Sequence, residues 1–214
     1  MKTSKKIIKE ELKKFCITND LLLCNTNEII CYKNEHFLFY IVCDFKPTYC
    51  DIGIYFTPLF ISQEELTLTF GNTLIHLTGQ TDLEITYSLK ETTIINKLNK
   101  NFKIALNKLK KWSDIITPSF IVQNIGSKKY NDIFYTEDLW KLELLGYCYG
   151  IQGYTLEATS AFLKLIADFS SRELEEWEMF KLDEWENALK TIETNQFDKF
   201  IEHKIQEAEK KLLI

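Results

Sequence analysis

The chain has 214 residues, of which 45% are hydrophobic, 14% aromatic and 27% charged, with only seven glycines and three prolines. This composition is typical of a folded globular protein and excludes a fibrous or intrinsically disordered chain. The formal charge is −5 and Arg172 is the single arginine, so binding that depends on bidentate recognition of phosphate or guanine is disfavoured.

The charges are unevenly distributed along the chain. Residues 1–131 contain 17 lysines and 13 acidic residues, for a net charge of +4. Residues 132–214 contain nine basic and 18 acidic residues, for a net charge of −9. We therefore expect the acidic half to favour a basic partner.

Neither a secretory signal nor a membrane span is expected. In the first fifteen residues only Ile7 and Ile8 are adjacent apolar residues, whereas a signal peptide needs an apolar run of about 7 to 15. Every apolar run is shorter than the roughly 18 residues of a spanning helix. The sequence thus predicts a cytoplasmic protein with reduced cysteines, namely Cys16, Cys24, Cys31, Cys43, Cys50 and Cys148.

Hydrophobic periodicity predicts a helix followed by strands in the first half. Ile8, Leu12 and Phe15 have helical spacing within residues 4–15. In residues 37–45, alternate positions would face opposite sides of a strand, and both sets of positions are largely apolar. This pattern is typical of a strand buried on both faces. Further strands are predicted at residues 28–32, 50–60, 66–70, 73–77 and 83–88. The strand at 50–60 is expected to end near Pro58, because proline cannot donate to a strand ladder.

The period becomes helical again in the second half. Residues 91–112 have an apolar stripe and, opposite it, a row of lysines: Lys97, Lys100, Lys103, Lys108, Lys110 and Lys111. We expect this row to be solvated or to face the acidic carboxy-terminal helices, so nucleic acid is not an expected partner. After Pro118 and the polar loop 124–132, the chain is predicted to be helical to its end.

The predicted fold is therefore α+β. An amino-terminal helix precedes an antiparallel sheet of five or six strands, and helical hairpins follow. We predict a sheet domain at 1–130 and a helical region at 131–214 packed on it, with one single domain as the alternative.

One stretch predicts a close-packed helical hairpin. Within residues 144–166, small and large residues occur in a fixed order: Leu145, Gly146, Tyr149, Gly153, Ala158 and Phe162. This order resembles one unit of a tetratricopeptide repeat over residues 139–170. A second unit in register would need small residues where Phe180 and Ile192 stand, and a solenoid needs about three units. The resemblance implies a hairpin completing a core, with a peptide-binding groove as the alternative.

The order of the elements also resembles, in plan only, small bacterial proteins of unknown function and some immunity proteins that neutralise toxins. This resemblance implies a protein partner and supplies no catalytic residue.

Motifs of catalysis and cofactor binding are missing from the sequence. It has no glycine-rich phosphate loop, no G-x-S-x-G turn and no H-E-x-x-H helix. The pairs Cys24/Cys31 and Cys43/Cys50 have a spacing of seven, unlike C-x-x-C zinc sites. His203 and Glu207 are expected to form a surface contact. We predict no catalytic residue, no metal site and no cofactor.

The first functional hypothesis is a non-enzymatic protein-interaction module. Aromatic anchors within a charged rim are typical of protein interfaces. The acidic, aromatic carboxy-terminal helices would bind a basic protein, and one version is an immunity protein covering the cationic site of a toxin. The candidate binding residues are Tyr149, Glu175, Glu176, Trp177, Glu178 and Trp185.

The alternative hypothesis is a small-molecule or enzymatic site between sheet and helices. It would use Asp44, Asp51, Tyr55 and His76. Asp44 is the main clue, because a buried carboxylate needs a partner or a function. The competing interpretation places Asp44 in a turn with Lys46 at the strand end.

Overall fold

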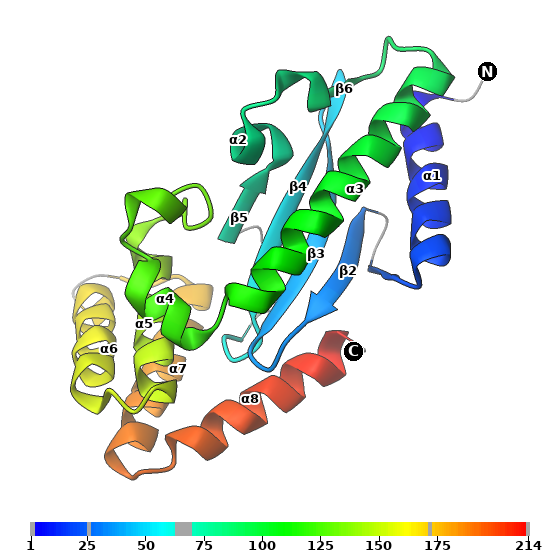
Figure 1. Ribbon diagram of the computed structural model, residues 1–214. Coiled ribbons are helices and arrows are strands. Elements are labelled where there is room, and N and C mark those ends of the chain that lie inside the picture. Colours follow the sequence, from blue (N-terminus) through cyan, green and yellow to red (C-terminus); the bar gives the residue numbers. More distant parts are fainter. Residues whose placement is uncertain (1–2, 25–26, 63–69, 171–172, 213–214) are drawn as a thin grey trace. The chain divides into compact units, whose positions relative to one another are not determined.

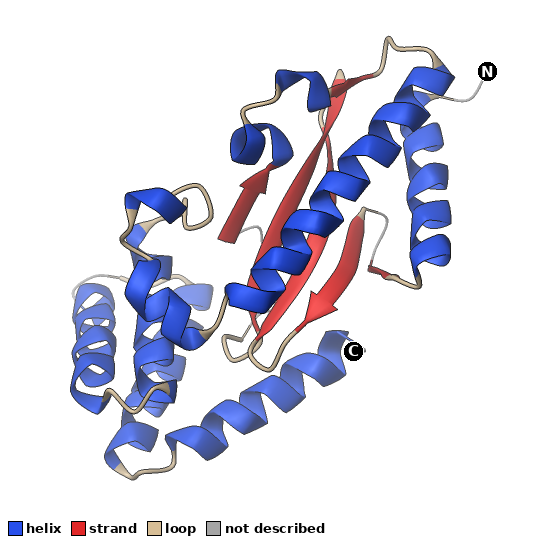
Figure 2. Ribbon diagram, viewed as in Figure 1, coloured by secondary structure: helices blue, strands red, loops and turns tan. Residues whose placement is uncertain are grey.

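The computed structural model describes residues 3–24, 27–62, 70–170 and 173–212 (Figures 1 and 2). The chain forms two compact units. The sheet unit comprises Met1–Thr57, Thr67–Ile115 and Asp132–Tyr135. The helical unit comprises Pro58–Leu66, Ile116–Asn131 and Thr136–Ile214. The domain boundary near residue 131 stays a prediction.

Two helices pack on each other along one face of the sheet in the sheet unit (Figure 1). Helix α1, Ser4–Asn19, buries Ile8 and Leu12, and the ring of its Phe15 stacks 4.4 Å from that of Phe102. Phe102 belongs to α3, Glu91–Ile115. Both helices were predicted, and each extends beyond the predicted end.

In the described ranges the sheet has six strands, in the order β1-β2-β3-β4-β5, with β6 also paired to β4. β5 and β6 occupy different stretches of the same edge of β4, because β5 pairs with Gly53–Phe56 and β6 with Tyr49–Cys50. The pairs β1–β2, β2–β3, β4–β5 and β4–β6 are antiparallel, which confirms the predicted fold class. The strands are β1 Leu22–Cys24, β2 Glu28–Lys33, β3 Phe37–Phe45, β4 Tyr49–Pro58, β5 Phe70–Thr73 and β6 Ile85–Thr86.

Strand β3 lies in the centre of the core. Its residues from Phe37 to Cys43 are all buried, which confirms the prediction of a strand buried on both faces. On β4, the Phe56 ring lies between 5.3 and 6.5 Å from five other rings. Those rings come from β3, β5, α3 and the loop before α5, so this aromatic cluster joins the layers of the sheet unit.

Two predicted strands are wrong or too long. The predicted strand 73–77 is wrong from Leu74 onward, since α2 spans Leu74–Thr78 and Thr73 is the last residue of β5. The Thr73 hydroxyl accepts from the His76 backbone N–H, and Gly79 ends the helix at a φ of 69°. The predicted strand 83–88 is too long, because the strand β6 comprises two residues of it and follows the short helix η1, Thr81–Leu83. The predicted strand 66–70 lies outside the described residues except for Phe70, where β5 begins.

The helical unit contains four long helices and two short ones among its described residues. Consecutive helices α5, α6, α7 and α8 contact one another, and α8 also contacts α5. The unit also buries Leu59, Phe60 and Ile61 in its core. The elements are α4 Pro118–Asn124, η2 Lys128–Tyr130, α5 Asp138–Ile151, α6 Thr155–Ser170, α7 Glu176–Glu193 and α8 Phe197–Leu212.

The predicted hairpin is formed by α5 and α6. Gly153 in the turn has a φ of 76°, which disfavours a side chain there. A Cβ on Gly146 would lie 3.2 Å from the Phe162 ring, so this glycine permits the close approach that the sequence predicted. Gly150, one turn later, was not singled out from the sequence, yet a Cβ there would overlap the ring of Phe197 on α8.

Within the described residues, no helix combines the length and apolar character needed to cross a membrane.

We expect Gly150→Ala to destabilise the helical unit by about 1 to 3 kcal/mol through overpacking against the buried Phe197 ring. Gly146→Ala is the matched control, because its nearest contacts are looser and alanine favours a helix. Urea unfolding followed by far-UV circular dichroism measures both. Equal losses of stability in the two variants would contradict this difference in packing.

Candidate functional site

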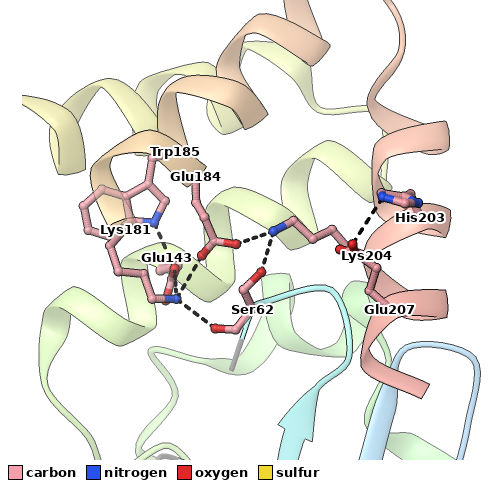
Figure 3. A network of polar contacts seen from close by, with 8 residues as sticks. All are labelled: Ser62, Glu143, Lys181, Glu184, Trp185, His203, Lys204 and Glu207. Carbon is pink, nitrogen blue, oxygen red and sulfur yellow. Dashed lines mark hydrogen bonds and ion pairs between the residues drawn. The ribbon is translucent and has the colours of Figure 1, made fainter. Parts of the chain in front are cut away.

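A network of buried charges links α5 and α7 in the helical unit (Figure 3). The Lys181 ammonium donates to Glu143 Oε1 at 3.0 Å and to Glu184 Oε2 at 3.3 Å. The indole Nε1–H of Trp185 donates to the same Glu143 oxygen at 2.9 Å. All four residues are buried. Each charged group in this network therefore has an opposite charge beside it, which offsets the cost of its removal from water.

The network continues to α8 and to the segment that follows β4. Lys204 on α8 donates to Glu184 Oε1 and to the hydroxyl of Ser62. Lys181 also donates to the Ser62 backbone carbonyl at 3.4 Å. Figure 3 shows both lysines pointing toward Ser62 from opposite sides. Two lysines and two carboxylates thus connect three helices to the turn that follows β4.

Helical spacing explains why α7 contributes so many inward groups. Lys181, Glu184, Trp185, Ala188 and Ile192 are all buried, at spacings of three, one, three and four residues. This is the periodicity of one helix face. A face that mixes lysine and glutamate with apolar residues is hard to recognise as a buried one from the sequence.

The neighbouring carboxylates disfavour acid–base catalysis by Lys181. Burial lowers the pKa of Lys181, but the charges and hydrogen bonds of Glu143 and Glu184 together raise that pKa above its ordinary value. Lys181 therefore stays protonated at neutral pH and cannot act as a general base. Among the described residues, the side chain that bonds the Ser62 hydroxyl is Lys204, which donates to it and to Glu184 and so is not placed as a general base.

A surface hollow of about 780 Å³ opens beside the network. Its size is within the range of sites that bury a ligand or a large side chain. Lys181 and Ser62 belong both to the network and to the lining of the hollow. The described lining residues are Ser62, Glu175, Glu176, Trp177, Phe180, Lys181 and Lys211.

Three of the six predicted binding residues meet at this hollow. Glu175 and Glu176 are exposed, and Trp177 is 45% exposed. They come from the first turn of α7 and the residue before it. Phe180, 54% exposed, joins them one turn later on the same helix.

The other three predicted binding residues are placed elsewhere. Trp185 is 0% exposed, so it is a core residue and not a surface anchor. Glu178 is buried as well, and its carboxylate accepts from the backbone N–H of Glu175. Tyr149 lies on α5, half-buried, with its ring edge-on to Tyr154 at 6.3 Å. The predicted cluster of Trp177, Trp185 and Tyr149 is thus not a single surface.

Trp177 is held firmly although it is exposed. Its indole N–H donates to Glu175 Oε2 at 2.8 Å. Its ring lies edge-on to Phe169 at 6.3 Å and 6.1 Å from Trp140. The exposed indole is therefore ordered by contacts within the helical unit.

Of the residues of the alternative hypothesis, Asp44, Asp51 and Tyr55 lie near enough to influence one another, whereas His76 belongs to another element. Asp44 is not a buried carboxylate, because its side chain is 37% exposed and pairs with Lys46 at 2.6 Å. Asp51 and Tyr55 share a face of β4, where burial raises the pKa of Tyr55 to about 12, with smaller contributions from Asp44 and Asp51. His76 lies exposed on α2.

Three lysines of the α3 row serve the sheet unit itself. Lys97 donates to the backbone carbonyls of Asp82 and Glu84 at 2.6 and 2.8 Å. Lys100 pairs with the Asp82 carboxylate at 2.8 Å. Lys108 donates to the carbonyl of Leu77 at 3.2 Å. These three therefore have intramolecular partners, which lie in residues 77–84 and not in the acidic carboxy-terminal helices.

The thiols and histidines show no reactive arrangement. The six cysteines are free, and burial raises the pKa of Cys16 to about 11 and the pKa values of Cys43 and Cys148 well above the ordinary value. These thiols stay protonated and are weak nucleophiles. His203 lies 3.5 Å from Glu207 on the exposed side of α8, as expected of a surface contact.

Among the described residues, no group of three or more His, Cys, Asp and Glu side chains is arranged to hold a metal ion. Comparisons of the chain with protein-family models, curated proteins and solved structures found no match. The hollow beside the network is therefore the candidate site on geometric and electrostatic grounds alone.

We expect Lys181→Met to destabilise the helical unit by about 3 to 5 kcal/mol, because Glu143 and Glu184 would lose their shared buried cation. The double variant Lys181→Met/Glu143→Gln should lose less, since it removes one unpaired carboxylate and keeps an oxygen for the Trp185 indole. Urea unfolding measures both. A double variant less stable than the single one would contradict a stabilising role for the pair.

The contribution of Lys181 should also depend on pH. A raised pKa in the folded state stabilises the protein fully below the unfolded value of about 10.5, and this stabilisation is lost as pH rises through the folded value. We therefore expect the stability difference between wild type and Lys181→Met to be constant at pH 7 to 9 and to shrink above about pH 10.5. A difference that grows in alkaline solution would contradict the ion-pair interpretation.

Proposed function

We propose that the protein is a non-enzymatic interaction module that binds a basic protein through the acidic, aromatic surface of its carboxy-terminal helices. The observation that supports it most is the pair Trp177 and Phe180, about half exposed beside the hollow and next to the carboxylates of Glu175 and Glu176. Large aromatic anchors within a charged rim are typical of protein interfaces.

Further large apolar side chains are exposed elsewhere on the helical unit. Met179 is 50% exposed on the same turn of α7. Leu156 and Leu163 are exposed on α6, which packs against α7, and their spacing of seven residues places them on one face of that helix.

Charge gives the partner its character. The net charge of −9 over residues 132–214 includes the acidic first turn of α7. An acidic surface accelerates association with a basic protein and disfavours acidic competitors. A cytoplasmic immunity protein that covers the cationic site of a toxin is one version of this proposal. The α5–α6 hairpin, similar to one tetratricopeptide unit, would then support the binding surface.

The test begins with affinity capture of partners on the tagged full chain, followed by binding measurements with the purified partner. Trp177→Ala should raise the dissociation constant at least about tenfold, as removal of a hot-spot residue does. Tyr135→Ala is the matched control, since Tyr135 is 71% exposed in the sheet unit. Raising the salt concentration should slow association.

Two results would contradict the proposal. One is a captured partner that binds both variants equally well. The other is an association rate that does not change with salt.

A further inference from the structure

The hollow beside α7 combines aromatic and anionic groups from the start of that helix and the residue before it. Trp177 and Phe180 are three residues apart and both are about half exposed. Glu175 and Glu176 place two carboxylates beside them. Aromatic faces attract cations, and carboxylates pair with them, so the two kinds of group favour the same ligand chemistry.

The positive groups around the hollow are largely neutralised. The charge of Lys181 is shared between Glu143 and Glu184, and Lys204 also pairs with Glu184. Lys211 lies exposed on α8, and a lysine of this kind can move on its flexible stem. Among the described lining residues, Glu175 and Glu176 supply two carboxylates and Lys181 and Lys211 two ammonium groups, of which the Lys181 charge is already offset by Glu143 and Glu184.

The aromatic cluster already has a cation against one of its members. The Lys181 ammonium lies 6.0 Å from the centre of the Trp140 ring. The Trp140 ring is in turn 6.1 Å from the ring of Trp177. Because Trp177 is also held by Glu175 and Phe169, its exposed part is ordered before any partner binds, which lowers the entropic cost of binding.

Resting on the proposed function, we infer that this hollow is a socket for an arginine side chain of the basic partner. A guanidinium is planar, so it can stack on an exposed indole and donate to a carboxylate with the same group. A lysine ammonium lacks this geometry. A purely apolar anchor would remove water from Glu175 and Glu176 without replacing their hydrogen bonds.

The socket can be tested without the partner by NMR titration of the full ¹⁵N-labelled chain. The probe is acetyl-Gly-Arg-Gly-amide, and the reporter is the indole N–H signal of Trp177, assigned from the spectrum of Trp177→Phe. We expect a saturable shift with a dissociation constant on the order of millimolar, as for a single side chain. The lysine peptide should bind at least about threefold more weakly, and the norleucine peptide should cause no shift.

A matched pair of charge variants locates the site. Glu176→Gln should weaken binding of the arginine peptide at least about threefold. Glu193→Gln removes the same charge from an exposed position at the other end of α7 and should have no effect. Neither substitution should disturb the fold, since both side chains are exposed, so the two variants can be compared directly.

The inference is overturned if norleucine and arginine peptides bind alike, or if the two glutamate variants behave alike. Failure of the socket and failure of the proposed function give different results. A basic partner whose binding depends on Trp177, combined with no response to the arginine peptide, overturns only the socket. Specific binding of the arginine peptide, combined with partner binding insensitive to Trp177, contradicts the proposed function.

Discussion

The buried ionic network around Lys181 constrains the helical unit more than any other interaction described. The Lys181 ammonium donates to Glu143 on α5, to Glu184 on its own helix and to the carbonyl of Ser62. Lys204 of α8 donates to Glu184 and to the hydroxyl of Ser62. Apolar residues of similar volume could be as stabilising as such pairs. The effect of the charges is selective: every one of them is satisfied only when three helices and the segment at Ser62 are in a single arrangement.

This constraint also sets the orientation of α7 about its axis. With Lys181, Glu184 and Trp185 directed inward, the start of the helix presents Trp177 and Phe180 outward at the hollow. Most of the described lining of the hollow therefore comes from α7 and the residue before it, and Lys181 belongs both to this lining and to the network. The carboxylate of Glu178 turns back to the backbone N–H of Glu175, which fixes the residue that in turn holds the Trp177 indole.

The chemistry of the described groups favours recognition over catalysis. Lys181 remains protonated between two carboxylates, and the most buried thiols remain protonated because of burial. The exposed groups at the hollow are aromatic rings and carboxylates in a half of the chain with a net charge of −9. Ordered aromatic rings beside exposed carboxylates suit a cationic group on another protein. The proposed arginine socket is the most specific form of that complementarity.

The sequence alone determined the types of most elements: the periodicity of α1 and α3, the doubly apolar β3 and the glycine-bearing hairpin of α5 and α6 are local patterns. It did not reveal α2, where a threonine cap and a glycine outweigh the strand-like residues between them. Nor did it separate Trp177 from Trp185, which are eight residues and so about 80° of helix rotation apart. Only the tertiary structure decided which tryptophan is inside, because the buried face of α7 is set by its packing on α6 and by the bonds of Lys181 to Glu143 and Ser62, which are 38 and 119 residues away in the chain. Burial depends on such distant contacts, and no local pattern encodes them.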